Sequence, residues 1–377
     1  MEDSVKAVER PSCVICSNAI FSPIITLKNM PIYMGVATNE IYDDLFFDQR
    51  WVECSSCGCL QLNRLVPLNL LYSHSHNSVI GNIWKNHHLE FKKFVLENSP
   101  KIIIEIGGGD GYLANLILND KFIQYTVVEP NPIKSNTRMN IIKDVIENNL
   151  EIINNADTII HSHVLEHLYN PLQVLRSISD NMKVGARMIF SIPNIPRLIS
   201  LDGGNALNFE HTYMLDKSQL EIIMNNLGFK MYKKFSYLEH SFFYSFIKMK
   251  TSAINLLEIP NISINSKNFK QMIINIDNFV DRLNNKLKNN EDNFIFGAHV
   301  FTQILFNRGL DSDRFKFVLD NSSDKVGKRL YGTSLMVKSP SHLKNHKNGN
   351  LVIRANHYQD EIVSQIKTIN PNINIIE

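Results

Sequence analysis

The chain has 377 residues, which is more than one hydrophobic core usually organises, so we expect two or three domains. Lys and Arg total 39 against 37 Asp and Glu, and the formal charge of +2 argues against nucleic acid or an anionic membrane as a partner. No apolar run reaches the roughly 18 residues that a membrane-spanning helix needs, and the N-terminus lacks an apolar signal core, so we expect a soluble, cytoplasmic protein.

The five cysteines are concentrated near the N-terminus, where they form two CxxC pairs and leave one further cysteine. A gap of two residues lets both sulfurs of a pair reach the same metal ion. The pattern predicts a tetrahedral Zn²⁺ site that stabilises a small N-terminal module, with no open position for catalysis, at Cys13, Cys16, Cys54 and Cys57. Two disulfides are the alternative, which a reducing cytoplasm disfavours. We interpret Cys59 as a small buried apolar residue.

The stretch KIIIEIGGGDGYLANLIL, residues 101–118, predicts a strand that turns sharply into a helix. Gly107 and Gly109 let the backbone approach a ligand closely. The spacing ExGGGxG differs from the GxGxxG that cradles a pyrophosphate, and Glu105 stands at the strand end, where it can face an ammonium group. Both features favour S-adenosylmethionine over NAD as the cofactor.

The strands that follow complete a predicted cofactor site. QYTVVEPNP ends in Glu129, from which a carboxylate can accept both ribose hydroxyls; a place beside a helix N-cap is the alternative. The strand in ADTIIHSHVLEHLYNP ends at Ser162 and His163, which we also place in the cofactor site. A strand at 185–194 and an antiparallel pair within 230–249 complete a doubly wound α/β sheet with its ligand site at the switch point.

The C-terminal part predicts a separate unit. Residues 251–292 are polar, rich in Asn and Lys, and carry a helical apolar pattern, so we expect a connecting helical segment. A second α/β unit follows in 293–377, where a strand turns at Gly297 into a helix. Because the further glycines of a dinucleotide fingerprint are missing after Gly297, we do not expect NAD there. Three basic residues near LYGT meet either a phosphate or solvent: Lys325, Lys328 and Arg329.

The stretch LNFEHTYML, residues 207–215, brings together an acid, a base and a phenol: Glu210, His211 and Tyr213. Taken alone, it fits an exposed loop as well as a catalytic one. We interpret Tyr213 as a packing residue at the start of the next helix. Because the stretch follows the strand at 185–194, we expect it in a loop that overhangs the cofactor site.

The run of motifs EIGGGDG, VVEP, ADTIIHSHVLEHL and GARMIFSIPN resembles class I S-adenosylmethionine-dependent methyltransferases. With both ends included, the chain resembles a narrower family, the nucleotide-sugar C-methyltransferases that act on deoxysugars for antibiotics and surface glycans. Those proteins begin with a four-cysteine zinc module that runs into CxxCGxxQL, here CSSCGCLQL. A segment ending in WxxH follows, here HSHNSVIGNIWKNH, and the resemblance extends through the C-terminal part to nearly the whole chain.

The resemblance implies an α/β architecture in which a Rossmann-like class I methyltransferase sheet is flanked by a small N-terminal zinc module and a C-terminal Rossmann-like domain. In the family the C-terminal domain helps to hold the sugar nucleotide against the core. A nucleotide sugar is therefore the implied substrate, with the sugar, the methylated carbon and the oligomeric state left open. The expected domains are the zinc module (1–75), the methyltransferase core (76–250), the connecting segment (251–292) and the C-terminal domain (293–377).

The resemblance also implies the catalytic residues. LNFEHTYML matches the place where the family carries a YHEH motif with its catalytic base, which makes His211 the base and Glu210 its acidic partner. Asn208 stands where the family has tyrosine, and His167, in HVLEH, matches another active-site histidine. Carbon becomes nucleophilic when a proton beside a carbonyl is removed to give an enolate. We therefore expect His211 to remove that proton, Glu210 to fix its tautomer and His167 to stabilise the enolate oxygen.

Three alternatives accompany this interpretation. His167 is otherwise a histidine that packs against a helix. O- or N-methylation of a sugar or small metabolite is the alternative reaction on the same scaffold, and a non-catalytic zinc-containing binding protein is the alternative function. The intact EIGGGDG motif and Glu129 count against the non-catalytic interpretation.

Overall fold

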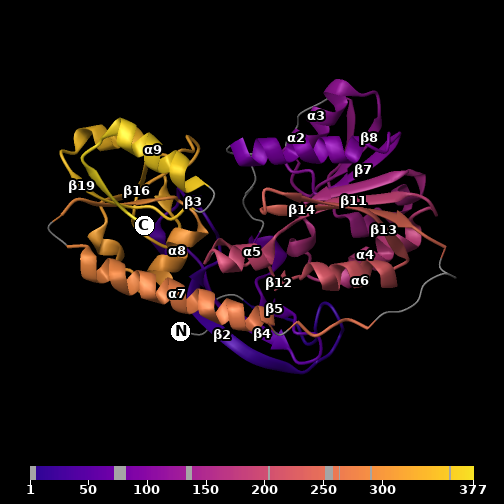
Figure 1. Cartoon of the computed structure of the whole chain (residues 1–377), viewed down its shortest axis with the longest axis horizontal. Helices are drawn as coiled ribbons and strands as arrows, with labels where there is room; N and C mark the ends of the chain where they lie inside the picture. Colours follow the sequence, from indigo (N-terminus) through magenta and orange to yellow (C-terminus); the bar gives the residue numbers. More distant parts are fainter. Residues whose placement is uncertain are drawn as a thin grey trace.

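The computed structural model describes residues 6–71, 82–132, 138–202, 204–250, 258–262, 264–288, 291–355 and 358–377. Two sheets lie side by side, with the N-terminal strands between and below them and the long helix α7 (Ile264–Lys286) running along the lower edge (Figure 1). No helix within the described ranges is long and apolar enough to cross a membrane.

The central sheet has seven strands in the order β13-β14-β11-β10-β7-β8-β9 (Figure 1). β7 pairs in parallel with both β8 and β10, so the strand order reverses beside β7, as the sequence predicts for a doubly wound sheet. β14 runs antiparallel to β11 and forms a hairpin with β13, which confirms the predicted antiparallel pair. The strands are β7 (Ile102–Ile106), β8 (Gln124–Val128), β9 (Met139–Ile142), β10 (Thr158–Ser162), β11 (Arg187–Pro193), β13 (Phe229–Tyr237) and β14 (Ser241–Lys248).

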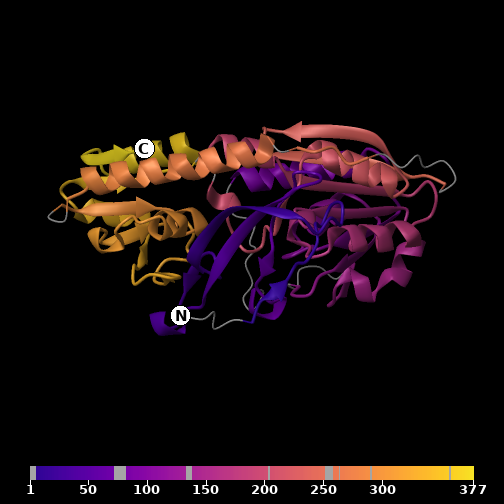
Figure 2. The ribbon, with the colours of Figure 1, turned by 90° about the horizontal axis from the view of Figure 1, so that it is seen from below.

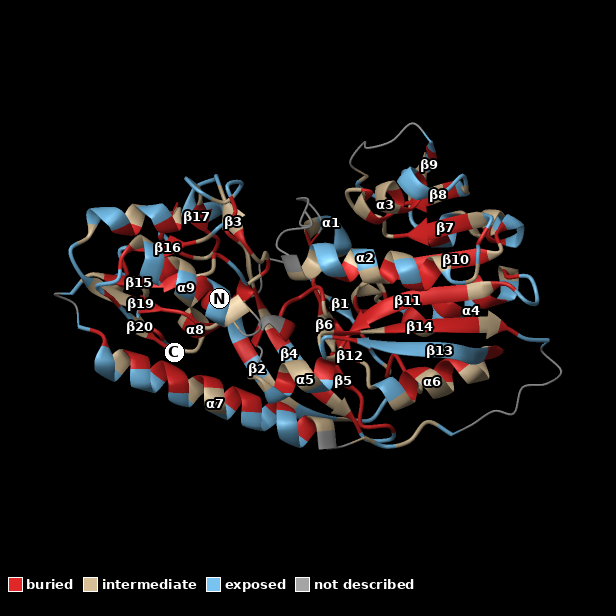
Figure 3. Ribbon diagram, turned by 45° about the horizontal axis from the view of Figure 1, so that its top comes forward, coloured by how far each residue is buried: buried red, intermediate tan, exposed pale blue. Residues whose placement is uncertain are grey.

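Helices cover both faces of this sheet. Neighbouring residues of a strand point to opposite faces, so Ile103 of β7 packs with α2 and α3 whereas Ile104 packs with α4 and α6. Burial on both faces explains why β7 is a nearly continuous apolar run. In Figure 3 the inner strands are mostly buried, while the edge strand β13 is exposed along its length. The helices are α2 (Asn82–Leu96), α3 (Tyr112–Asp120), α4 (Pro171–Asn181) and α6 (Lys217–Asn226).

The N-terminal module shares a sheet with the methyltransferase-like core. Its strands β2 (Phe21–Pro31), β4 (Phe46–Cys54) and β5 (Leu60–Leu62) are joined by β12 (Tyr213–Met214), which comes from the core. β1 (Val8–Glu9) pairs with β6 (Arg64–Leu65) beside them. Tyr213 is a buried packing residue, as predicted, but its predicted place at the start of a helix is wrong, because β12 pairs with β5 and α6 begins only at Lys217.

The C-terminal unit contains a five-stranded parallel sheet in the order β18-β16-β15-β19-β20, which confirms the predicted second α/β unit. The strands are β15 (Asn293–Phe296), β16 (Phe317–Leu319), β18 (Val337–Lys338), β19 (Gly349–Val352) and β20 (Ile373–Ile376), with helices α8 (Val300–Asn307) and α9 (Gln359–Ile369). α7, within the predicted connecting segment, packs against β2 and α5 (Ile195–Ser200) as well as the C-terminal unit (Figure 2). One hydrophobic core therefore unites all three parts.

A buried ion pair ties the C-terminal unit to the N-terminal module. The Arg329 guanidinium donates to both carboxylate oxygens of Asp44 at 2.6 Å each, and Gly332 donates its N–H to the same carboxylate at 2.7 Å. Nearby, β17 (Arg329–Leu330) pairs with β3 (Val36–Ala37). The expectation that Arg329 meets a phosphate or solvent is wrong, because its charge is already neutralised inside the protein. Lys325 donates to the Asp320 carboxylate at 3.0 Å.

Candidate active site

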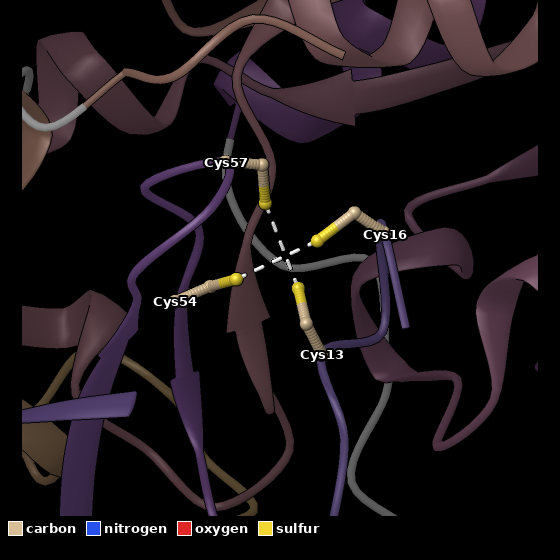
Figure 4. A group of neighbouring side chains, drawn as sticks. All are labelled: Cys13, Cys16, Cys54 and Cys57. Carbon is tan, nitrogen blue, oxygen red and sulfur yellow. Dashed lines mark hydrogen bonds between the residues drawn. The ribbon is translucent and has the colours of Figure 1, made fainter. Parts of the chain in front are cut away.

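The four predicted zinc ligands converge on one point. Cys13 Sγ lies 3.6 Å from Cys57 Sγ, and Cys16 Sγ lies 3.5 Å from Cys54 Sγ (Figure 4). All four sulfurs lie within 4.8 Å of one another, and the cysteines are free thiols. A tetrahedral site with Zn–S bonds of about 2.3 Å needs sulfurs about 3.8 Å apart, so the spacing fits a Zn²⁺ ion. Cys59 is buried beside them, as the sequence predicts.

The glycine loop after β7 adopts backbone angles that favour glycine. Gly107 has φ +71°, and a Cβ there would lie 2.5 Å from a methyl group of Val164. Gly109 has φ +52° with open space at the Cβ position. Glu129, at the end of β8, accepts a hydrogen bond from the Gly109 N–H at 3.1 Å. Glu129 therefore fixes the loop, and the predicted contact of its carboxylate with ribose hydroxyls stays a prediction.

Glu105 lies beneath this loop. Its side chain is buried and accepts a hydrogen bond from the Tyr125 hydroxyl at 2.7 Å. Burial raises the pKa of Glu105 to about 7, and the hydrogen bond from Tyr125 opposes the rise. A Cβ on Gly108 would approach the Glu105 carboxyl group to 3.2 Å. The carboxyl group thus supports the loop from below, and its predicted contact with the cofactor ammonium remains a prediction.

Ser162 and His163 lie at the carboxyl end of β10, where the sequence places them. Ser162 Oγ is 2.9 Å from Ser191 Oγ on β11. His163 has a left-handed backbone with φ +54°, and both of its ring nitrogens have partners: Glu166 Oε1 and Ser241 Oγ, each at 3.0 Å. Burial lowers the pKa of His163 well below its ordinary value. His163 therefore belongs to a hydrogen-bonded network inside the protein.

The WxxH segment contributes to the surroundings of His163. The rings of Trp84 and His87 lie edge-on to the His163 ring, with centroids 4.9 Å and 5.2 Å away. His87 is fully buried, and burial lowers its pKa far below the ordinary value. The part of HSHNSVIGNIWKNH before residue 82 lies outside the described residues.

The stretch LNFEHTYML is irregular up to Thr212, as expected for a loop, and most of it is buried. Its position over the cofactor stays a prediction. Asn208 Oδ1 accepts hydrogen bonds from the backbone N–H groups of Glu210 at 2.8 Å and His211 at 2.7 Å, which closes a tight turn. Leu62 of β5 then donates to the Thr212 carbonyl at 2.9 Å. The N-terminal module therefore covers this segment, and Asn208 shapes it.

Arg10 fastens the same segment from the other side. Its guanidinium donates to the carbonyls of Thr212 and Tyr169 at 2.9 Å each, and to the Leu62 carbonyl at 3.1 Å. Burial lowers the pKa of Arg10 to about 10. A buried arginine that satisfies three carbonyls fixes the position of the neighbouring catalytic candidates.

The acidic and basic candidates form one cluster. His167 Nδ1 lies 3.4 Å from Glu210 Oε2, and the rings of His167 and His211 have centroids 5.0 Å apart. One carboxylate oxygen of Glu166, one ring nitrogen of His167 and one ring nitrogen of His211 all lie within 4.8 Å of one another. Glu210 thus pairs with His167, and Glu166 is the carboxylate whose charge acts on His211. The expectation that Glu210 orients His211 stays a prediction.

Burial sets the protonation of this cluster. It raises the pKa of Glu210 to about 7. It also raises the pKa of Glu166, against the opposing effect of His167 and His211. Burial lowers the pKa of His211, and the charge of Glu166 works in the opposite direction. A carboxyl group such as Glu210, with a pKa of about 7 beside imidazole rings, is suited to moving protons.

All three parts of the chain face this cluster. Glu210 contributes to raising the pKa of Tyr33, in the N-terminal module, after the larger effect of burial. In the C-terminal unit, burial lowers the pKa of His299 to about 4, with smaller contributions that include His211. Gln303 on α8 donates to the carbonyls of Tyr33 and Tyr331 at 2.9 Å each. The cluster therefore lies where core, N-terminal module and C-terminal unit meet.

Sequence comparison assigns the two larger parts. Residues 84–234 match the family described as "Methyltransferase domain", and residues 264–373 match "C-methyltransferase C-terminal domain". The protein is an S-adenosylmethionine-dependent methyltransferase. No curated protein matches this methyltransferase in sequence.

Solved structures resemble the methyltransferase over less than half its length. The N-methyltransferase NodS from Bradyrhizobium japonicum WM9 is 13% identical over 45% of this chain and 97% of its own, with a TM-score of 0.33. The 1,6-didemethyltoxoflavin-N1-methyltransferase of Burkholderia thailandensis is 11% identical over 45% and 82%, with a TM-score of 0.36. Human N-acetylserotonin methyltransferase is 14% identical over 45% and 53%, with a TM-score of 0.37.

Several residues of the methyltransferase site were not predicted from the sequence: Arg10, Tyr33, Glu166, Ser241 and His299. Glu166 had a usable signal, because it lies three residues after His163 in HVLEH, a spacing at which two side chains share one helical face. The others come from distant segments with no local pattern. Their place in the site depends on the packing of the three parts.

Proposed function

We propose that this methyltransferase transfers a methyl group to a carbon atom of a nucleotide-linked ketosugar, through an enolate generated by His211. The observation that carries the proposal is the match of residues 264–373 to the C-terminal domain of C-methyltransferases. The acid–base cluster supports it, because transfer to carbon first requires removal of a C–H proton, whereas oxygen or nitrogen already has a lone pair.

Each residue of the cluster has a proposed part in this reaction. His211 removes the proton beside the carbonyl, and the Asn208 turn holds His211 in position. His167, paired with Glu210 at 3.4 Å, donates a hydrogen bond to the enolate oxygen. When bound, S-adenosylmethionine supplies an electrophilic methyl group. The glycine loop, Glu105, Glu129 and the end of β10 hold it at the neighbouring strand ends.

The C-terminal unit is proposed to hold the nucleotide part of the substrate. His299 begins α8 at the carboxyl end of β15, and Lys325 lies beside it, donating to the Ala298 carbonyl at 3.0 Å. His299 is close enough to both Lys325 and His211 for their charges to act on it. Nucleotide phosphates favour such strand ends in parallel sheets.

We also propose that Zn²⁺ binds Cys13, Cys16, Cys54 and Cys57 as a structural ion. The four thiols fill a tetrahedral coordination sphere and leave no position for a substrate. Such a thiolate site persists in a reducing compartment, which supports a cytoplasmic location.

The test combines the enzyme, labelled S-adenosylmethionine and a panel of nucleotide 4-ketosugars. Each ketosugar is matched with its 4-hydroxy counterpart, which has no acidic proton beside a carbonyl. C-methylation predicts labelling of a ketosugar alone, and NMR of the product shows a new carbon–carbon bond with every hydroxyl retained. A methyl ether or N-methyl product, or equal labelling of the 4-hydroxy sugar, would contradict the proposal.

A further inference from the structure

A continuous chain of hydrogen bonds leaves the acid–base cluster. Glu166 Oε1 lies 3.0 Å from His163 Nδ1, and His163 Nε2 lies 3.0 Å from Ser241 Oγ. Ser241 Oγ lies 2.6 Å from His240 Nδ1. Each of these atoms can give or accept a proton, since a hydroxyl and the two nitrogens of a neutral imidazole offer both functions. The four side chains therefore form an unbroken proton-conducting path.

The inner end of this path is next to the proposed base. Glu166 contributes one of the ligand atoms that lie within 4.8 Å of those of His167 and His211. While Oε1 is bonded to His163, the other oxygen of Glu166, Oε2, is buried without a hydrogen-bond partner among the described residues. This oxygen is therefore available to His211.

The outer end of the path, His240, is half-buried and lies next to exposed residues. His240 lies in the turn between β13 and β14, and Ser241 is the first residue of β14. In that turn Leu238 is 63% exposed and the Glu239 side chain is 68% exposed, whereas Ser241 is fully buried. The path thus leads from the interior, through one buried hydroxyl, to an exposed hairpin turn.

We propose that Glu166, His163, Ser241 and His240 form a relay that carries the substrate proton from His211 to solvent. The inference rests on the proposed C-methylation. Transfer of a methyl cation from a sulfonium to a C–H carbon releases one proton for each turnover. That proton starts on a buried imidazole, so the enzyme needs an exit for it.

The proton balance is as follows. The substrate C–H bond breaks, its electron pair stays in the enolate, and the proton bonds to His211. Before turnover Glu166 holds a proton on Oε1, in the hydrogen bond to His163 Nδ1. His211 returns to neutral by giving its proton to Glu166 Oε2 while the Oε1 proton passes to His163 Nδ1, and a half-turn of the carboxyl group then restores the starting arrangement of Glu166. His163 then passes its Nε2 proton to Ser241, and Ser241 passes its own hydroxyl proton to His240 Nδ1.

His240 releases its Nε2 proton to water, so one proton enters the path and one leaves. Because burial lowers the pKa of His163 well below its ordinary value, His163 does not hold the extra proton. The shifts through His163 and Ser241 therefore occur together.

Ser241→Ala tests the relay, because it removes the single hydroxyl in the middle of the path. Ser245→Ala is the matched control: Ser245 is also buried, lies four residues further along β14, and bonds Arg187 at 3.4 Å outside the path. We expect Ser241→Ala to lower kcat about 10- to 100-fold. This is no more than the smallest rate contribution usual for a positioned proton-transfer group, which is about 100-fold. S-Adenosylmethionine affinity should stay unchanged, and added imidazole buffer should restore part of the rate.

His240→Gln provides a second variant, at a half-buried residue in the turn between β13 and β14. It should show the same buffer-dependent loss, and Ser245→Ala should match the wild type. The relay is overturned if His240→Gln keeps the wild-type kcat at low buffer concentration, or if Ser241→Ala and Ser245→Ala have equal kcat values. The proposed C-methylation would stand in either case. A wild-type enzyme that neither methylates nor exchanges protons with any ketosugar overturns the proposed function and the relay with it.

Discussion

Replacing the proposed base, His211→Gln, tests the centre of the mechanism. Glutamine is similar in size and keeps a polar group, and the Asn208 side chain holds the turn through backbone N–H groups, so the fold should survive. Burial lowers the pKa of His211, which keeps the imidazole neutral and able to accept a proton at pH 7. Glutamine cannot accept a proton in this range.

A positioned base contributes roughly 10²- to 10⁴-fold to the rate, so kcat should fall by that factor, which corresponds to about 3 to 5 kcal/mol of barrier. Affinity for S-adenosylmethionine, measured by calorimetry, should not change, because the glycine loop is on another segment. Exchange of the substrate α-proton with deuterated solvent, followed by NMR, should be abolished. Exchange at the wild-type rate would refute the assignment and direct attention to His167 and Glu166, which lie within 4.8 Å.

Three further predictions follow from the same structure. Gly107→Ala should abolish S-adenosylmethionine binding in calorimetry, because the new Cβ would lie 2.5 Å from a methyl group of Val164. Gly185→Ala is the control: its φ of +89° brings comparable backbone strain, but its Cβ would meet open space, so this variant should bind the cofactor normally. Folding raises the pKa of Glu105 from 4.5 to about 7, so its contribution to stability is fully present below pH 4.5 and is lost as pH rises to 7. Denaturant unfolding of the protein without cofactor should therefore show a fall in the free energy of unfolding of up to about 3 kcal/mol over this pH range. Glu105→Gln should remove this pH dependence. Metal analysis of gently purified protein should find one zinc per chain. A Tm that is unchanged after the metal has been removed with a chelator would argue against a structural ion.

The sequence predicts the elements whose signals are local. β7, the glycine turn and α3 were predicted because an apolar run, four glycines and a helical pattern follow one another within 101–118. The clustering of the four cysteines was predicted because the CxxC spacing is a local signal of thiols that share one site. Asn208 was interpreted as a departure from a catalytic motif, yet its turn-closing role follows from the ordinary tendency of asparagine to bond the backbone two and three residues on.

The residues that were mispredicted depend on pairings across long stretches of chain. Asp44 and Arg329 are 285 residues apart in sequence, and no periodic pattern shows that one neutralises the other. The pairing of Glu210 with His167 likewise depends on how the segment after β11 lies against the segment after β10. Local patterns set which residues form strands and helices, whereas partner choice is set by the packing of those elements.

The zinc site and the proposed catalytic segment are linked through one strand. Cys57 and Cys59 lead directly into β5, and β5 pairs with β12, which begins two residues after His211. The Leu62 N–H bonds the Thr212 carbonyl at 2.9 Å, and Arg10, three residues before Cys13, bonds the same carbonyl at 2.9 Å. Each of the two CxxC pairs is therefore only a few residues away from a group that hydrogen-bonds Thr212, the residue after the proposed base. If the proposed Zn²⁺ holds the four cysteines together, we expect its loss to loosen β5 and Arg10 together and so to change the position of His211, although the ion contacts no substrate.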